Sequence, residues 1–157
     1  MIAERILEAA QRKGVMIATA ESCTGGLVAA ALTDVAGSSA IFDRGFVTYS
    51  NAAKIEMLDV QAASLQKYGA VSEAVAREMA LGAVLHSQAT LAVSVTGIAG
   101  PGGSDTKPEG RVCFAVALEQ QIQVCQTIEF GALGRDQVRK AARDHALSLL
   151  LGAMTRL

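Results

Sequence analysis

The sequence predicts an α/β fold: a three-layer α/β/α sandwich with a mixed, partly parallel sheet. Apolar runs of strand length alternate with helical patterns along most of the chain. Two consecutive strand-like runs near the C-terminus predict an antiparallel pair, which makes the sheet mixed. Residues of the set AVILMFWYC make up 51%, many of them Ala and Val, and such small side chains suit helices packed on a sheet. With 157 residues, the chain fits one domain over residues 1–157.

The first third of the chain alternates helix and strand. The expected elements are a helix over 2–13, a strand over 15–20, a helix over 27–33 and a strand over 41–49. Ile2, Ile6 and Ala10 recur on one helical face, and Gly14 ends that helix. The two strands are short apolar runs with β-branched residues. A short helix carrying Lys54 follows, capped by Ser50 or Asn51.

The middle of the chain is more helical. A helix over 61–68 ends at Gly69, and a longer one over 73–87 begins at a Ser72 cap. Apolar residues recur every fourth position of the longer helix, which gives it one buried face. A strand over 90–95 leads into the loop 97–110, which holds five glycines and both prolines.

The last third contains a hairpin and a closing helix. Strands over 111–118 and 122–130 flank a turn at 119–121. The helix over 135–157 is apolar at Val138 and then at every fourth residue. No linker, repeat or low-complexity tract divides the chain.

Composition narrows the range of functions. The net charge of −1, the lack of a basic cluster and the absence of Trp argue against a nucleic-acid partner. No apolar run reaches the roughly 18 residues of a membrane span, and no signal peptide is visible. Three cysteines without CxxC spacing argue against a zinc site or a disulfide framework. We therefore expect a cytoplasmic enzyme or binding domain without a bound metal.

Three polar loops follow predicted strands: residues 21–26, the corner at 50–51, and residues 97–110. Ligands of α/β sheets bind beyond the carboxyl ends of the strands. The three loops are therefore expected to converge on one pocket.

A serine, a tyrosine and a lysine flank the predicted strand 41–49. Ser39 is a candidate nucleophile with Lys54 as its base, because burial of an amine favours its neutral form. Tyr49 would relay a proton or hold the lysine in place. The alternative is structural: a turn serine, a solvated lysine and a strand aromatic.

Two glycine-rich loops offer backbone N–H groups to a ligand. Gly97 and Gly100, with the Thr96 hydroxyl, form either an oxyanion hole or anion nest, or an ordinary surface crossover. The second loop contains Thr24, Gly25 and Gly26 at the start of a helix, where phosphate binds well. The alternative interpretation of this second loop is an ordinary turn between a strand and a helix.

Other polar side chains are open to two interpretations. Glu21 is placed to hydrogen-bond a ribose or an amide. Cys23 suggests a thiol nucleophile, but no histidine lies near it in sequence, and His86 and His145 fall on helices where packing or surface roles are expected. Arg135 opens the last helix, where it either clamps a phosphate or is a surface arginine.

Several long motifs together resemble the C-terminal domain of the CinA competence/damage-inducible family. They are Ala20-Glu-Ser-Cys-Thr-Gly-Gly, Ala36-Gly-Ser-Ser with Gly45-Phe-Val-Thr-Tyr-Ser-Asn-Ala-Ala-Lys, Gly69-Ala-Val-Ser, and Gly97-Ile-Ala-Gly-Pro with Gly102-Gly-Ser. The resemblance covers nearly the whole chain. One departure is the segment 111–114, Arg-Val-Cys-Phe, where relatives often carry Thr and Trp.

The resemblance implies hydrolysis of the carboxamide of nicotinamide mononucleotide, giving nicotinic acid mononucleotide and ammonia in pyridine-nucleotide salvage. It assigns Ser39 as nucleophile, Lys54 as base and Tyr49 as an assisting group. Thr96 and Arg135 would contact substrate, with Arg139 as the alternative to Arg135. It further implies an α/β/α homodimer without metal or cofactor. The alternative function is a non-catalytic nucleotide-binding or competence-related interaction module, which would not need the three catalytic candidates.

Overall fold

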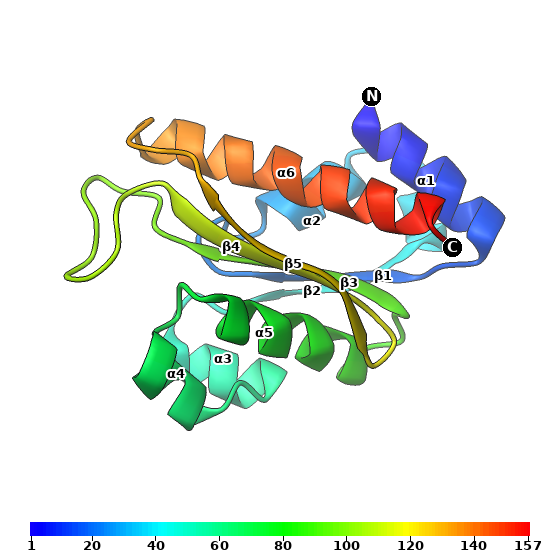
Figure 1. Cartoon of the computed structure of the whole chain (residues 1–157). Helices are drawn as coiled ribbons and strands as arrows, with labels where there is room; N and C mark the ends of the chain where they lie inside the picture. The colour runs from blue at the N-terminus through cyan, green and yellow to red at the C-terminus, as the bar shows by residue number, and fades with distance from the viewer.

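A computed structural model describes all 157 residues as a five-stranded mixed sheet between two layers of helices (Figure 1). The helices are α1 (Ile2–Lys13), α2 (Leu27–Thr33), α3 (Asn51–Leu58), α4 (Ala62–Tyr68), α5 (Glu73–Leu85) and α6 (Arg135–Thr155). The strands are β1 (Ile17–Glu21), β2 (Phe42–Val47), β3 (Leu91–Gly97), β4 (Arg111–Leu118) and β5 (Gln121–Glu129), in the spatial order β2-β1-β3-β4-β5. Strand β1 runs parallel to β2 and β3, whereas β4 is antiparallel to β3 and β5. The predicted sandwich and mixed sheet are confirmed.

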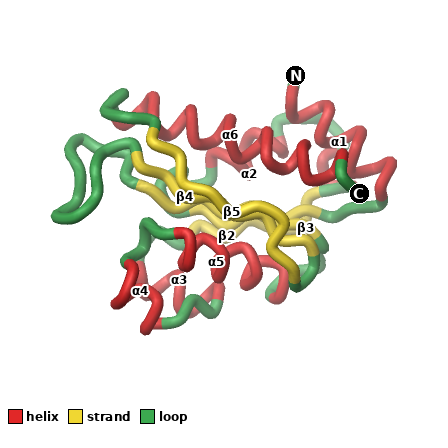
Figure 2. Tube along the Cα trace, viewed as in Figure 1, coloured by secondary structure: helices red, strands yellow, loops and turns green.

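The two faces of the sheet carry side chains of different size. Helices α1, α2 and α6 cover one face, and α3, α4 and α5 cover the other (Figure 2). On β3 and β4, branched and aromatic residues such as Val93 and Phe114 point towards α6. The intervening residues, such as Ala92 and Ala115, lie in the core beneath α5. Because successive side chains alternate between faces, the alanine face lets α5 approach the sheet closely.

Local sequence signals place most element ends correctly. Helix α1 ends where Gly14 adopts a left-handed conformation with φ 67°. The hydroxyl of Ser50 accepts a hydrogen bond from Ala53 N at 3.0 Å and caps α3. Ser72 caps α5 in the same way through Val75 N at 3.3 Å. These predicted caps are confirmed.

The structure shortens the strand expected over 41–49 and tightens the hairpin. A 3₁₀ turn over Ser38–Ala40 occupies the approach to β2, so the strand begins at Phe42 and ends at Val47. The hairpin turn contains only Glu119 and Gln120, and Glu119 takes the positive φ of 54° that so tight a turn requires.

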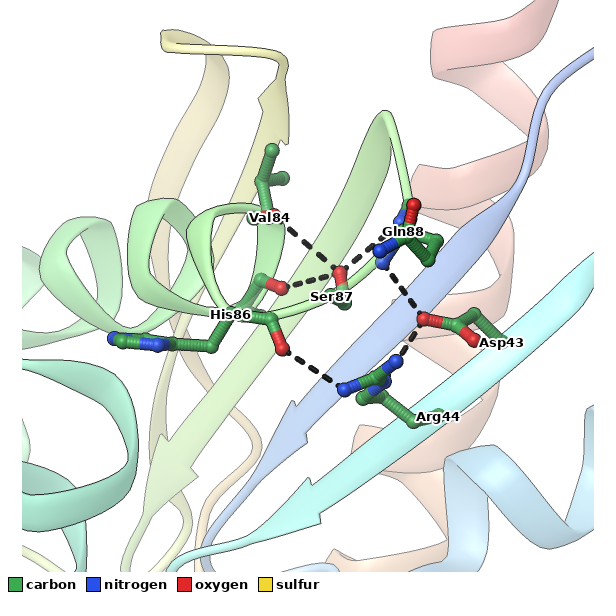
Figure 3. A network of polar contacts seen from close by, with 8 residues as sticks. Asp43, Arg44, Val84, His86, Ser87 and Gln88 are labelled. Carbon is green, nitrogen blue, oxygen red and sulfur yellow. Dashed lines mark hydrogen bonds and ion pairs between the residues drawn. The ribbon is translucent and has the colours of Figure 1, made fainter.

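A polar network joins the start of β2 to the end of α5 (Figure 3). Asp43 Oδ2 accepts the Gln88 N–H at 2.8 Å and the Arg44 Nε–H at 2.9 Å. Arg44 also donates to the His86 carbonyl at 3.2 Å, and the His86 ring pairs with Asp59 at 2.6 Å. The network lies at the amino ends of the parallel strands. None of the helices has both the length and the apolarity that a membrane crossing requires.

Candidate active site

The carboxyl ends of β1, β2 and β3 lie at one edge of the sheet because these strands are parallel. The loops that follow them are joined there by hydrogen bonds. Ser22 N donates to Val95 O at the end of β3, and Thr48 N donates to Glu21 O, both at 2.9 Å. The loop after β3 is tied to the start of α6 through Gly100. The three loops therefore lie at one edge of the sheet, but of the three only the loop 97–110 lines the largest cleft.

Lys54 lies in the first turns of α3, and its side chain points into the protein. Only 1% of the residue is exposed. Its Nζ lies 2.9 Å from Ser22 Oγ, 2.9 Å from Thr48 O and 3.4 Å from Tyr49 O. No carboxylate forms an ion pair with it. Burial therefore lowers the pKa of Lys54 below its ordinary value.

The three contacts of this amine suit either of its protonation states. As an ammonium it donates to the Ser22 hydroxyl and to two backbone carbonyls. An uncharged amine has two N–H groups and one lone pair. The two backbone carbonyls, of Thr48 and Tyr49, accept the N–H groups, and the third contact is the Ser22 hydroxyl, which can donate its own proton. The lone pair of Lys54 can therefore take the proton of Ser22, as a general base does for a serine nucleophile.

Ser39 does not lie beside Lys54. It belongs to the exposed 3₁₀ turn that precedes β2, whereas Lys54 follows β2. A six-residue strand spans roughly 20 Å. The hydrogen bond from Ile17 N to Ile41 O also places this turn at the amino end of β1. The expected pairing of Ser39 with Lys54 is wrong, and Ser22 occupies that place.

Ser22 was not predicted to be a nucleophile, although its position in the sequence contains a signal for that role. Ser22 is the first residue after β1 in the strand-turn-helix unit 17–33. A residue at that position lies at the carboxyl edge of the sheet, which is also the edge where a residue following β2 must lie. Ser39, which precedes β2, belongs to the opposite edge.

Glu21 and Thr24 hold the turn that carries Ser22. The buried Glu21 carboxylate accepts four hydrogen bonds: from Thr24 Oγ1 at 2.6 Å and from the N–H groups of Gly26, Val28 and Ala29 at 3.2, 2.9 and 3.0 Å. It thereby caps the amino end of α2. The expectation that the Glu21 side chain hydrogen-bonds a ribose or an amide of the substrate is corrected, because its carboxylate is bound to Thr24 and to the start of the helix.

The two glycines and Arg139 complete this turn. Gly25 and Gly26 have φ of 56° and 108°, which side-chain-bearing residues rarely adopt. Arg139 donates from Nε to Cys23 O at 3.1 Å and from Nη2 to Thr24 O at 3.3 Å. Its guanidinium therefore braces the turn from the α6 side.

Arg135 is the arginine that faces the loop edge. Its Nη1 donates to Gly100 O at 2.8 Å and its Nη2 to Tyr49 Oη at 2.9 Å. Tyr49 is 61% exposed, so its ring is open to solvent beside this contact. Tyr49 supports Lys54 through its carbonyl rather than its phenol.

The base of the loop after β3 is firmly held. The buried Thr96 hydroxyl donates to Ala70 O at 2.9 Å. The backbone of Ile98, near the start of the loop, is hydrogen-bonded to residues at its end. Ile98 N donates to Arg111 O at 2.9 Å, and Ile98 O accepts from Gly110 N at 2.8 Å. At Gly97 a Cβ would lie 2.6 Å from a Val112 methyl, so the backbones there approach as only glycine allows.

The remaining candidates do not form a second catalytic set. Cys23 is buried, and burial raises the pKa of its thiol to about 11, so it stays protonated near neutral pH. His145 packs edge-on against Phe114 with ring centroids 4.6 Å apart, which confirms its packing role. No cluster of three or more His, Cys, Asp or Glu side chains is arranged to hold a metal ion.

Comparison with known proteins finds one matching family and several similar proteins. A family model described as the CinA C-terminal domain matches residues 1–154. The nicotinamide-nucleotide amidohydrolase PncC of Escherichia coli K12 is 49% identical over 150 residues, which cover 95% of this chain and 90% of that protein. A CinA-like protein of Chloroherpeton thalassium is 46% identical over 94% of this chain, although the match covers 37% of that longer protein.

Solved structures give the same result for the fold. The crystal structure of competence/damage inducible protein CihA from Agrobacterium tumefaciens superimposes with a TM-score of 0.93 at 47% identity, covering 98% of this chain and 93% of that one. A CinA superfamily protein from Klebsiella pneumoniae gives a TM-score of 0.94 at 37% identity, with 99% and 97% coverage.

Proposed function

The chain belongs to the CinA C-terminal domain family, and from that premise we propose that it hydrolyses the carboxamide of nicotinamide mononucleotide to nicotinic acid mononucleotide and ammonia. The names of relatives 49% identical to it support this substrate. The observation that carries the proposal is the 2.9 Å contact between Lys54 Nζ and Ser22 Oγ.

The proposed reaction is an acyl transfer through Ser22. The Lys54 amine takes the hydroxyl proton, and Ser22 Oγ bonds to the carboxamide carbon. The N–H groups of Cys23 and Thr24 donate to no other residue, and we assign them to the oxyanion. Lys54 returns the proton to the leaving nitrogen, so that the C–N bond breaks and ammonia departs. Water, deprotonated by the same amine, then hydrolyses the ester and restores the Ser22 hydroxyl.

Arg135 and the loop beginning at Thr96 are the proposed substrate contacts. Arg135 is exposed at the carboxyl edge, where it donates to Gly100 O and Tyr49 Oη, whereas the partly buried Arg139 donates to the Ser22 turn. The Tyr49 ring and the backbone of Gly97 and Gly100 lie along the same edge. We propose that they orient the nucleotide above Ser22.

The wider biological assignment follows the family resemblance. We propose a single-domain homodimer that acts in the cytoplasm in pyridine-nucleotide salvage, without metal or cofactor. Light scattering coupled to size-exclusion chromatography measures the dimer, and ammonia release in the presence of EDTA tests the independence from metal.

Paired serine variants test the nucleophile. Ser22→Ala should lower kcat for ammonia release by about a thousandfold or more, because it removes the attacking oxygen. Ser39→Ala should stay within about twofold of the parent, since Ser39 lies on an exposed turn at the other edge.

Three results would contradict the proposal. Full activity in Ser22→Ala would remove Ser22 from the mechanism. Loss of activity in folded Ser39→Ala would restore Ser39 as the nucleophile. Tight binding of the mononucleotide without ammonia release by the parent protein would favour the non-catalytic nucleotide-binding or interaction module.

A further inference from the structure

The largest cleft of the molecule lies between the end of α4 and the loop 97–110. Its volume is about 470 Å³, within the range of small-molecule sites. One wall is formed by residues 65–71 and the other by Ile98, Ser104, Thr106 and Lys107. The loop projects beyond the carboxyl edge of the sheet (Figure 1).

The polar groups that line this cleft favour an anion. The lining residues include the basic Lys67 and Lys107 and the hydroxyl-bearing Tyr68, Ser104 and Thr106, and none of them is an aspartate or glutamate. Lys67 and Lys107 are the charged residues of the lining, so the concave surface carries an excess of positive charge, although Asp105 lies next to two lining residues in the sequence.

Lys107 is fixed in position and still has a donor to offer. Its Nζ donates to Tyr68 O and Val71 O, each at 2.5 Å, which spans the cleft from one wall to the other. An ammonium has three N–H groups, so one remains for a ligand. Because the side chain is already immobilised, contact with an anion would cost little further side-chain entropy.

The cleft adjoins the Ser22 site through a short chain of contacts. Ser22 N is bonded to Val95 O, and the next residue, Thr96, is bonded through its hydroxyl to Ala70 O, which belongs to the cleft wall. Ile98, two residues further, lines the opposite wall. The cleft therefore lies beside the edge of the sheet that carries Ser22.

We propose that this cleft is the subsite for the phosphate of the nucleotide substrate, with Lys107 and Lys67 as its cationic ligands, so that the enzyme discriminates the nucleotide from the corresponding nucleoside. This inference rests on the proposed function. It assigns Lys107 and Lys67 to phosphate recognition, in addition to the contact proposed for Arg135.

Two substrates that differ only in the phosphate test the proposal. We would compare kcat/KM for nicotinamide mononucleotide and nicotinamide riboside in Lys67→Met and Lys107→Met. Each change removes one charge-assisted contact and should lower kcat/KM for the mononucleotide roughly tenfold or more. The value for the riboside should change less than about twofold. The Lys67 side chain makes no hydrogen bond or ion pair within the protein, and its Nζ lies 5.1 Å from the centroid of the Tyr68 ring, so Lys67→Met should fold normally.

Lys140→Met is the matched control. Lys140 is an exposed residue of α6 paired with Asp136, outside the cleft, and its substitution changes the net charge equally. Neither substrate should respond to it. Equal losses for both substrates in Lys67→Met, or no loss for either, would overturn the proposal, and Lys67→Met decides alone if Lys107→Met does not fold.

A binding measurement separates this inference from the proposed function. Calorimetry with ribose 5-phosphate requires no turnover. Weaker binding in Lys67→Met and unchanged binding in Lys140→Met would support the phosphate subsite even if the protein released no ammonia. Unchanged affinity in Lys67→Met would refute the subsite even if the protein proved to be an amidase.

Discussion

At the residue scale, the environment of Lys54 determines how activity depends on pH. The amine is a base only when it is deprotonated, and burial lowers its pKa. We predict that kcat/KM rises with pH until the amine is fully deprotonated and is level above that point. A profile between about pH 5 and pH 10 would measure this.

The control for this prediction is Lys54→Arg. A guanidinium stays charged over the whole range and cannot accept the Ser22 proton. This variant should be inactive at every pH tested. An acidic limb that persisted in an active Lys54→Arg protein would show that another group is titrating.

The sequence could identify Lys54 but not its partner. Ser22 and Lys54 are 32 positions apart and meet only because β1 and β2 are parallel neighbours. The pairing of Ser39 with Lys54 relied on closeness along the chain and on the family resemblance, and the strand between them separates their side chains. The role of Glu21 could not be predicted for a similar reason. Its carboxylate meets its four hydrogen-bond donors only once the turn has folded against α2.

At the element scale, the segments with clear end signals were predicted best. Helix α2 and strand β4 have the bounds expected from the sequence. Strand β2 was overestimated at both ends, because an apolar run does not reveal where the chain leaves the sheet. The strand order depends on pairings between distant segments, which no local pattern encodes.

Gly82 explains how closely α5 packs on the end of α3. A Cβ at this position would lie 1.9 Å from the backbone oxygen of Leu58, which cannot move aside as a side chain would. We predict that Gly82→Ala lowers the free energy of unfolding by about 3 kcal/mol. Urea denaturation would measure the loss.

A second helical glycine provides the matched control. At Gly152 of α6, a Cβ would meet only the end of the flexible Arg156 side chain, at 3.4 Å. Gly152→Ala should therefore raise stability by about 0.5–1 kcal/mol through helix propensity. Equal effects at the two sites would show that contact with α3 does not limit α5.

At the scale of the whole molecule, the candidate catalytic groups and the Asp43 network lie at opposite edges of the sheet. The Ser22 and Lys54 groups lie at the carboxyl edge, and the network around Asp43 lies at the amino edge (Figure 3). The composition correctly indicated close helix packing, because the alanines form the face beneath α5. It gave no indication of this division of roles, which depends on the direction of each strand.

Asp43→Ala tests the division. The Gln88 N–H, with a further contribution from Arg44, holds the pKa of Asp43 below its usual value. A carboxyl group whose pKa is lower in the folded protein stabilises the fold, and this contribution is fully present above the ordinary pKa. The contribution is lost as the pH falls through the lower pKa of the folded protein. We predict a loss of about 1 kcal/mol at pH 7 that shrinks below about pH 4, with kcat unchanged. A large fall in kcat would contradict the separation of the two edges.

Cys23 follows directly after Ser22, and its thiol is the less reactive of the two neighbours although sulfur is ordinarily the better nucleophile. Burial holds the pKa of Cys23 at about 11, whereas the Ser22 hydroxyl has the Lys54 amine beside it. At neutral pH, iodoacetamide should leave Cys23 unmodified, and a fluorophosphonate should label Ser22. Mass spectrometry of the one peptide that contains both residues would measure which of the two neighbouring side chains reacts, and so which of them the fold has activated.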